Sequence, residues 1–406
     1  MKPFRCLKSV SEFEKAKRII PGGAHFSHRP LLKCEFPSYM EKGNGSHIWD
    51  IDGNEYIDYL LGFGAITLGH ANAMINDAAI EQMKKGMMLS RPGTIQNRLV
   101  EKLIEMLPCA EMAYLFKDGS GATTAAIRIA RAHTGREKVV RWGYNGWHDW
   151  CCQKWPLGIP SCNYESTIEM NYNDLNNLEE IFDSNKDEIA CIIMEPTLMD
   201  KPDEDYLSAV KTLAINNGAL LIFDEIKTFP RFSLSGAQGF FGVTPDMSTV
   251  GKGMANGFPI SAVVGTKDVM NTAENVRLSA TFNVEIVSMA AAMATLEIFQ
   301  NGNVVDHIWR MGEVLISGLE KIVKQSGVEA GVVGYAPMPL LKFGYSDQKL
   351  NLAMRESFYT EALKRRIFYH PTHVWFVSNS HTEEDIRETL EASGQAIEAT
   401  KKEVLG

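Results

Sequence analysis

A carboxylate and a lysine that could do chemistry follow two apolar stretches of the chain. Residues 219–223 are five apolar residues without alternation, and Asp224 and Glu225 end the run. Such a run is typical of a strand covered on both faces, and a carboxylate at its carboxyl end lies where open α/β sheets bind ligands. Lys252 stands between two glycines. It can therefore turn its amine inward, where partial burial would lower its pKa toward that of a usable nucleophile.

This pair of groups suggests pyridoxal phosphate. The chemistry of that cofactor needs a lysine that holds the aldehyde as a Schiff base and an acid that keeps the pyridine nitrogen protonated. Lys252 and Asp224 could serve as these two groups. On this stretch alone, an alternative stays open: the carboxylates cap a turn, and Lys252 is a solvated loop lysine.

A second stretch could bind an anion. Residues 113–116 read as a strand, residues 118–121 as a glycine loop, and residues 122–133 as an alanine-rich helix. The free N–H groups and the dipole of a helix N-terminus favour phosphate, so Gly119 and Ser120 are candidate phosphate ligands. The alternative is that the glycines serve only the geometry of a tight turn.

Other candidates lie in loops and at strand ends. Tyr144, in an aromatic and glycine-rich loop at the end of a predicted strand, offers a flat face on which a planar ring could stack. Glu195 ends the apolar run 189–194. Arg29 could pair with a substrate carboxylate, and His148 could line a polar aromatic pocket for a sugar or another amino compound.

These candidates need a sheet to position them. Strand and helix patterns alternate from about 113 to 265, which predicts an α/β fold with a mostly parallel sheet and right-handed crossovers. A hairpin within 45–60 and a C-terminal tail with strands at about 331–343 and 373–378 predict a smaller α+β domain. The predicted domains are an N-terminal segment 1–70 that joins the small domain, a large cofactor-binding domain 71–300, and a C-terminal domain 301–406.

Composition narrows the class of protein. A net charge of −9 argues against nucleic acid or an anionic membrane surface as partner. There is no leader-like apolar region and no apolar run long enough to span a membrane, and the seven scattered cysteines lack metal-ligand spacing and fit a reducing compartment. We therefore expect a cytoplasmic protein without a bound metal.

Taken together, the motifs resemble a known family. Leu-Ile-Phe-Asp-Glu at 221–225 is followed by Gly-Ala-Gln at 236–238, Thr-Pro-Asp at 244–246 and Gly-Lys at 251–252. With Phe-Pro at 258–259 and a glycine at 265, this set resembles the class III aminotransferases of the fold-type I pyridoxal-phosphate enzymes. Within that family it is most similar to the branch that contains glutamate-1-semialdehyde aminomutase.

The resemblance implies roles for single residues. Lys252 would carry the Schiff base, and Asp224 would pair with the pyridine nitrogen. Tyr144 would stack on the ring, and Glu195 matches a glutamate of the family's strand end. The remaining matches are Gly119 and Ser120 as phosphate ligands, Arg29 as a ligand for the substrate carboxylate, and Thr281 as a residue that reaches the phosphate of the neighbouring subunit, which implies a homodimer with shared active sites.

Departures from the family pattern affect the expected activity. The family usually has a glutamate where this chain has Gly121 and a histidine where it has Asn145, and the aminomutase branch has a gating glutamate near 373–375, here His-Val-Trp. Residues 282–285, Phe-Asn-Val-Glu, also differ from the small residues and proline of that branch. We therefore expect an aminotransferase that acts on an amino donor and a keto or aldehyde acceptor. The alternatives are an intramolecular 2,1-aminomutase and, from another class, a non-catalytic or a flavin- or nucleotide-binding α/β protein.

Overall fold

The computed structural model describes residues 4–25, 39–152 and 157–406, and it divides into two compact units. The small unit combines Met1–Asn72 with Asp306–Gly406, and the large unit is Ala73–Val305. The domains expected from the sequence stay predictions, since compactness alone does not show that a segment folds by itself.

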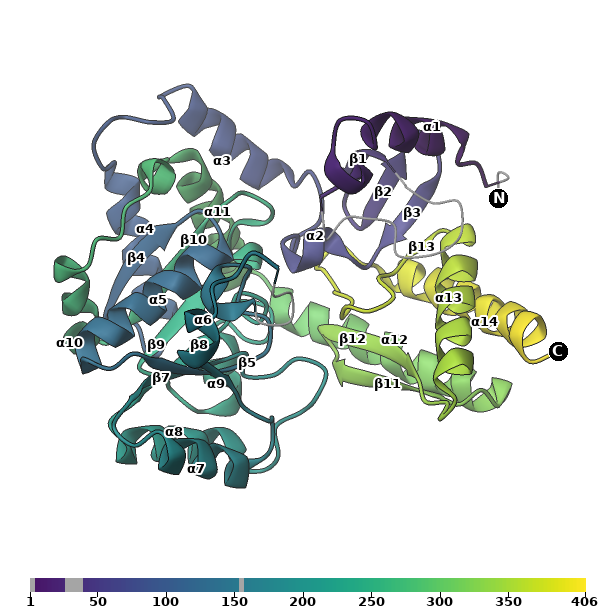
Figure 1. Ribbon diagram of the computed structural model, residues 1–406. Coiled ribbons are helices and arrows are strands. Elements are labelled where there is room, and N and C mark those ends of the chain that lie inside the picture. Colours follow the sequence, from purple (N-terminus) through teal and green to yellow (C-terminus); the bar gives the residue numbers. More distant parts are fainter. Residues whose placement is uncertain (1–3, 26–38, 153–156) are drawn as a thin grey trace. The chain divides into compact units, whose positions relative to one another are not determined.

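The large unit is built on a seven-stranded sheet with the order β4-β10-β9-β8-β7-β5-β6 (Figure 1). Its strands are β4 (Met112–Phe116), β5 (Lys138–Trp142), β6 (Thr167–Glu169), β7 (Ile189–Met194), β8 (Leu220–Asp224), β9 (Met247–Val250) and β10 (Ser261–Gly265). Its α-helices are α3 (Ala73–Met83), α4 (Thr94–Met106), α5 (Gly119–Thr134), α6 (Cys162–Glu165), α7 (Leu175–Ser184), α8 (Tyr206–Asn216), α9 (Gly236–Phe241), α10 (Lys267–Asn271) and α11 (Val287–Asn301). Short 3₁₀ turns include η4 (Lys252–Ala255) and η6 (Thr281–Val284).

The apolar runs of the sequence are buried on both faces of this sheet. Within β7, Cys191 and Ile193 pack with α5, whereas Ile192 and Met194 pack with α7 and α8. The alternating sides of one strand therefore both meet helices, which explains why its sequence shows no polar alternation. α4 and α11 cover β9 and β10 on the face opposite α5.

Strand direction brings several loops to one edge of the sheet. β5, β7, β8 and β9 are mutually parallel. β10 runs antiparallel to both β9 and β4, so β4 points the same way as the parallel set. The carboxyl ends of β4, β9, β8, β7 and β5 thus share one edge, the place where open α/β sheets bind ligands.

The small unit contains two further sheets. One has the order β1-β2-β3-β13, and the other pairs β11 with β12. The strands are β1 (Met40–Asn44), β2 (His47–Asp50), β3 (Glu55–Asp58), β11 (Ala330–Tyr335), β12 (Met338–Phe343) and β13 (Ile367–Phe368). The helices are α1 (Leu7–Ala16), α2 (Leu61–Gly64), α12 (Val304–Ser326), α13 (Gln348–Lys364) and α14 (Glu383–Val404). The predicted hairpin is confirmed as β2 and β3.

Three local expectations differ from the structure. The strand expected at 373–378 is wrong, because this segment forms no ladder. Its backbone N–H groups instead donate singly, from Trp375 to Pro339 of β12, from Phe376 to Tyr59, and from Val377 to Pro337. Gly119 and Ser120 lie in the first turn of α5 and not in a loop before the helix, because Asp118 caps the helix through the N–H of Gly121. The sequence reading also missed β9, whose four residues include two polar ones.

Candidate active site

Six of the seven cofactor-site residues expected from the sequence follow carboxyl ends of strands at the shared edge. Asp224 is the last residue of β8, and Glu195 follows β7. Lys252 comes two residues after β9, and Tyr144 two residues after β5. Gly119 and Ser120 follow β4 and open α5.

The carboxylate of Asp224 is buried, and three hydrogen-bond donors of the protein surround it. Its Oδ1 accepts from Thr249 Oγ1 at 3.1 Å and from the backbone N–H of Ile226 at 3.3 Å. Its Oδ2 accepts from Asn145 Nδ2 at 2.9 Å. Burial and the nearby Glu195 carboxylate raise the pKa of Asp224 to about 6, against these donors, which favour the charged form. The group is therefore mostly ionised at neutral pH.

The amide of Asn145 has its orientation fixed by Arg141. Arg141 Nε donates to Asn145 Oδ1 at 3.2 Å, and a guanidinium can only donate. The amide oxygen must face Arg141, so the NH₂ group faces Asp224. Asn145 is 1% exposed, and its backbone oxygen accepts from Thr123 Oγ1 at 2.7 Å.

Lys252 has an unusual backbone conformation and an amine with a lowered pKa. Its φ of 44° lies in the left-handed region, which costs energy for a residue other than glycine and is frequent at functional sites. The side chain is partly buried. Burial, helped by the positive charge of Lys227, lowers the pKa of its amine to about 7. A substantial fraction of this amine is thus unprotonated at neutral pH.

Glu195 is 2% exposed, and both of its carboxylate oxygens accept from protein donors. Oε1 accepts from Lys227 Nζ at 2.6 Å, and Oε2 accepts from the backbone N–H of Tyr144 at 2.8 Å. The ring of Tyr144 is half exposed, and Lys227 Nζ lies 5.8 Å from its centroid. About half of this aromatic side chain is thus accessible to a ligand.

The first turn of α5 offers a small set of donors. Within the described residues, no hydrogen bond is found for the backbone N–H groups of Gly119 and Ser120. Ser120 Oγ accepts from the N–H of Trp147 at 3.2 Å, which leaves its own hydrogen free to be donated. A side chain at Gly146 would place its Cβ 2.5 Å from Ser120 Oγ, so only glycine fits there. This donor set suits an anion.

The three remaining residues expected at the site are His148, Thr281 and Arg29. His148 Nδ1 lies 2.7 Å from Thr124 Oγ1, which also accepts from Trp150 Nε1 at 2.9 Å. Thr281 is exposed at the start of η6. Arg29 lies outside the described residues.

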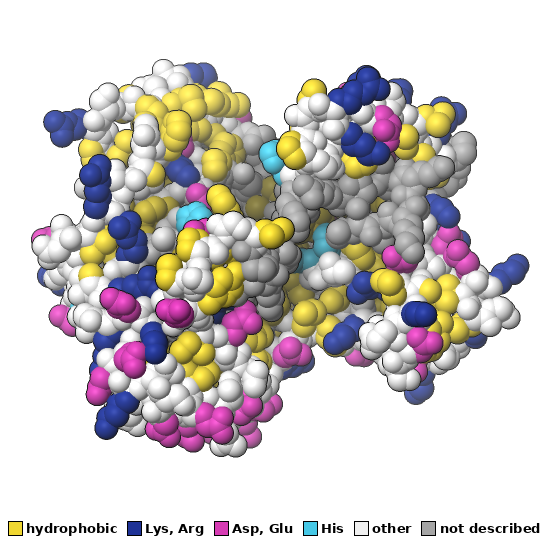
Figure 2. Space-filling view, viewed as in Figure 1, with side chains coloured by type: hydrophobic (Ala, Val, Ile, Leu, Met, Phe, Trp, Pro, Cys, Tyr) yellow, Lys and Arg dark blue, Asp and Glu magenta, His cyan; other side chains and the backbone are white. Residues whose placement is uncertain are grey.

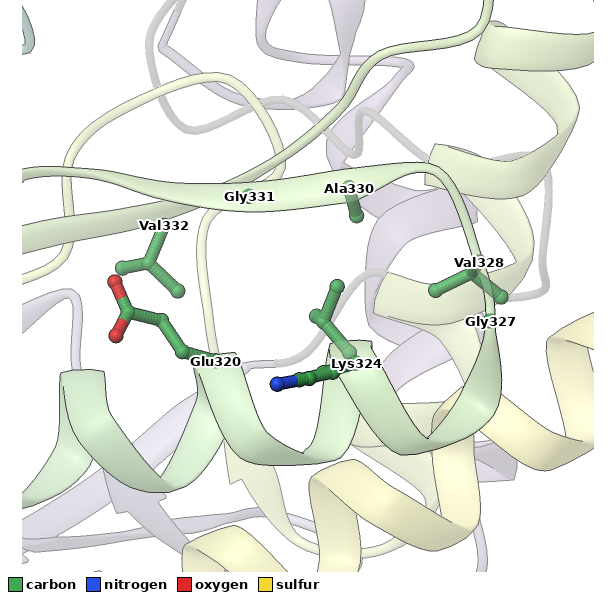
Figure 3. Close-up of a pocket in the computed structure, with 8 residues that line it drawn as sticks. Glu320, Lys324, Gly327, Val328, Ala330, Gly331 and Val332 are labelled. Atoms are coloured by element: carbon green, nitrogen blue, oxygen red, sulfur yellow. The ribbon is translucent and has the colours of Figure 1, made fainter.

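Among the described residues, no group of three or more His, Cys, Asp or Glu side chains could hold a metal ion. A cavity of about 510 Å³ lies between the end of α12 and the start of β11 in the small unit (Figure 3). Its lining consists of Glu320, Val323, Lys324, Gly327, Val328, Ala330, Gly331 and Val332, none of them expected at the site.

Comparison with known proteins identifies the class. The sequence profile described as Aminotransferase class-III matches residues 33–335. The chain belongs to this family, and it is a pyridoxal-phosphate-dependent aminotransferase of fold type I. The cofactor, the fold and the reaction class expected from the sequence are thereby confirmed.

The relatives include both activities that the sequence left open. A 3-aminobutyryl-CoA aminotransferase of Cloacimonas acidaminovorans is 42% identical over 97% of this chain and 98% of its own. A glutamate-1-semialdehyde 2,1-aminomutase of Methanococcoides burtonii is 35% identical over 95% of this chain and 97% of its own. The structure of the FumI protein of Sphingopyxis sp. MTA144, in its PLP internal aldimine form, superposes with a TM-score of 0.93, at 30% identity and 98% coverage of both chains.

The groups at the sheet edge fit pyridoxal phosphate. An ionised buried acceptor suits a protonated ring nitrogen, a partly unprotonated amine suits an aldehyde, and the first turn of α5 suits a phosphate. Two residues of this arrangement escaped the sequence reading, Lys227 and Thr249. Lys227 follows Asp224 by three positions, which was its only signal, and Thr249 lies in the missed strand β9.

Proposed function

We propose that Lys252 is the lysine that holds the cofactor and that Asp224 pairs with its ring nitrogen. When bound, pyridoxal phosphate supplies an aldehyde that accepts an amine and a ring that withdraws electrons from the substrate carbon. Asp224, kept as a carboxylate by its three donors, holds the proton on the ring nitrogen. Gly119 and Ser120 bind the phosphate at the start of α5, and the half-exposed Tyr144 stacks on the ring.

Lys252 then serves as the acid and base of the reaction. An amine whose pKa is about 7 can both accept and return a proton near neutral pH, which is the condition for efficient general acid–base catalysis. The observation that carries this assignment is the place of Lys252, two residues after β9, at the same edge of the sheet as Asp224, the last residue of the neighbouring β8. His148 and Arg29 stay candidates for substrate contacts.

The Lys252→Ala variant tests the assignment. We expect it to lose the visible absorbance of bound cofactor, together with turnover by at least about 100-fold, the usual contribution of a positioned acid–base group. Spectra and a transamination assay on purified protein measure both. Lys84→Ala, which removes an exposed lysine paired with Glu81, is the matched control. A Lys252→Ala protein that keeps absorbance and turnover would remove the assignment.

We propose an amino donor whose amine stands on the carbon β to a carbonyl group. The support is twofold: the 42% identical relative is named for 3-aminobutyryl-CoA, and a structure at 27% identity, with a TM-score of 0.85, is a β-phenylalanine aminotransferase of Variovorax paradoxus. A screen of α-, β- and ω-amino compounds for conversion of the bound cofactor to its pyridoxamine form tests this. Conversion by α-amino acids alone would contradict it.

Intramolecular 2,1-aminomutase activity is the second candidate, favoured by the relatives at 35% identity. Near the positions where the aminomutase branch is expected to carry its gating glutamate, this chain has His373, Val374 and Trp375, and Trp375 is fully buried. Release of a free keto product from one amino compound indicates transfer between molecules. Rearrangement of glutamate-1-semialdehyde without such release would indicate the aminomutase.

We propose that the chain forms a homodimer with shared active sites and works in the cytoplasm. An apolar patch, defined here as Met87, Met88, Leu89 and Phe282, is exposed on the large unit, and Figure 2 shows hydrophobic side chains gathered over neighbouring α3. The N–H of Ile286 donates to Met87 O at 3.1 Å, which joins the two segments of the patch. Thr281, the residue expected to reach the partner's phosphate, adjoins Phe282. Five described cysteines, Cys109, Cys151, Cys152, Cys162 and Cys191, carry free thiols, which fits a reducing compartment. Separately, none of the helices in the described part of the chain could span a membrane.

A further inference from the structure

A second lysine lies buried at the same sheet edge as Lys252. The side chain of Lys227 is 6% exposed and that of Glu195 is 3% exposed, and their Nζ and Oε1 atoms are 2.6 Å apart. A charged pair withdrawn from water to this degree is costly to maintain unless its geometry is good. The roles proposed above for Lys252 and Asp224 leave Lys227 without a function.

The pair joins loops that follow three neighbouring strands. Lys227 comes after β8, Glu195 after β7, and Tyr144, whose N–H donates to the other oxygen of Glu195, after β5. A side chain at Gly143 would place its Cβ 2.5 Å from Glu195 Oε2, so the carboxylate passes directly over a glycine. One carboxylate therefore fixes both the tyrosine segment and the lysine ammonium.

Both members of the pair are among the four charged groups that influence the pKa of the Lys252 amine. Two of these are positive, Lys227 and Arg231, and two are negative, Glu195 and Asp224. Lys227 is the strongest of the four, and it acts in the same direction as burial, against the protonated amine. The opposing carboxylate of Glu195 is neutralised in part by its contact with Lys227.

We propose that the ion pair of Glu195 and Lys227 is a positioning device, which holds the Tyr144 segment in place and presents a fixed positive charge to the Lys252 amine. The inference rests on the proposed role of Lys252. It assigns no direct contact with substrate to either partner. Its consequence is that the two partners, when removed singly, change the reactivity of Lys252 in opposite directions.

The directions follow from the charge that each variant leaves behind. Lys227→Met leaves the carboxylate of Glu195 unpaired, and a nearby opposite charge should raise the pKa of the Lys252 amine by roughly 1 unit or more. Glu195→Gln leaves the ammonium of Lys227 unpaired and should lower that pKa. The double variant removes both charges and should fall between the two single variants. Lys227→Arg keeps the charge and should stay near the parent protein.

Covalent capture of the cofactor by full-length protein measures this reactivity. Capture forms a C=N bond between Lys252 Nζ and the aldehyde carbon and releases one water, and only the unprotonated amine attacks. The rate of capture is followed by visible absorbance at several pH values. The pH at which this rate is half-maximal therefore reports the pKa of the Lys252 amine. Lys84→Met, which also removes an ion-paired lysine but at an exposed site, is the matched control and should leave that pH unchanged.

The outcomes separate this inference from the proposed function. Borohydride reduction followed by peptide mass spectrometry shows which lysine holds the cofactor, and a lysine other than Lys252 would overturn the proposed function itself. With the cofactor on Lys252 in every variant, equal half-maximal pH values for Lys227→Met and Glu195→Gln would overturn the positioning role alone. If Lys227→Met alone does not fold, the double variant is compared with Glu195→Gln. The double variant contains no unpaired charge, so its half-maximal pH should be higher than that of Glu195→Gln, and equal values would overturn the positioning role.

Discussion

At the residue scale, Asn145 controls the charge state of Asp224. Its NH₂ group donates to Asp224 Oδ2, which favours the carboxylate over the neutral acid. Asn145→Ala removes that donor, so the pKa of Asp224 should rise above its present value of about 6. The charged form is then lost at a higher pH on acidification. We expect cofactor affinity at neutral pH to fall by about tenfold or more, as for a lost hydrogen bond to a charged group.

Measured dissociation constants for pyridoxal phosphate across pH check this prediction. Thr249→Val removes another donor to the same carboxylate and should act in the same direction. An affinity that stays unchanged over the whole acid range in both variants would contradict the role of these donors.

The sequence indicated Lys252 and Asp224 because each stands in a local context with its own physical meaning, a glycine-flanked lysine and an acid that ends an apolar run. It could not indicate what Asn145 does. The amide orientation depends on Arg141, four residues earlier, and on the register between β5 and β8, which are separated by β7 in the sheet. The function of Lys227 likewise depends on a partner 32 residues away along the chain.

At the scale of elements, a histidine links β2 to the start of α14. His47 Nε2 lies 2.9 Å from Asp385 Oδ1, and its Nδ1 lies 3.0 Å from Glu55 Oε1. The hydrogen bond to Asp385 raises the pKa of His47 above its ordinary value of 6.5. Because the raised value belongs to the folded state, the stabilisation is fully present below pH 6.5 and is lost as pH rises through the folded pKa.

His47→Gln should therefore lower the free energy of unfolding by about 1 kcal/mol in mildly acidic solution, the usual worth of a partly exposed ion pair. The difference from the parent protein should shrink as pH rises. Denaturant unfolding at several pH values measures it, with His25→Gln at an exposed histidine as control. A difference that does not vary with pH would show that the pair contributes through packing only.

The pattern of apolar residues predicted most elements closely, and the reasons for the failures are local. The apolar periods of residues 206–216 and 304–326 predict helices with these bounds, and α8 and α12 have them, because the ends of both periods are distinct. The run 373–378 has a strand-like composition, but the buried Trp375 and Phe376 donate to different partners, Pro339 of β12 and Tyr59, and not to one continuous strand. β10 lies antiparallel in the sheet, and nothing in its apolar sequence distinguishes it from a parallel strand.

At the scale of the whole molecule, the apolar patch predicts how copies of the chain associate. Phe282 is 62% exposed, and exposed apolar residues that cluster in this way mark interaction surfaces. Phe282→Asp places a charge in the centre of the proposed contact. We expect the dimer dissociation constant to rise by about tenfold or more, and activity to fall with the dimer, because Thr281 of each subunit would serve its partner.

Sedimentation of parent and variant over a range of concentrations, together with activity at the same concentrations, checks this prediction. Ile215→Asp on α8 is the control, since Ile215 is 58% exposed but lies outside the patch. A Phe282→Asp protein that stays dimeric would place the contact elsewhere.

The contrast between two tryptophans gives the protein a built-in optical reporter. Trp375 is fully buried and stacks on Tyr369 with ring centroids 3.7 Å apart, whereas Trp147, beside Ser120, is 70% exposed. A quencher dissolved in water reaches the second indole and not the first. The chain has seven tryptophans. In a variant that keeps only these two, iodide should remove the emission of Trp147, and the residual fluorescence should follow the packing around Trp375.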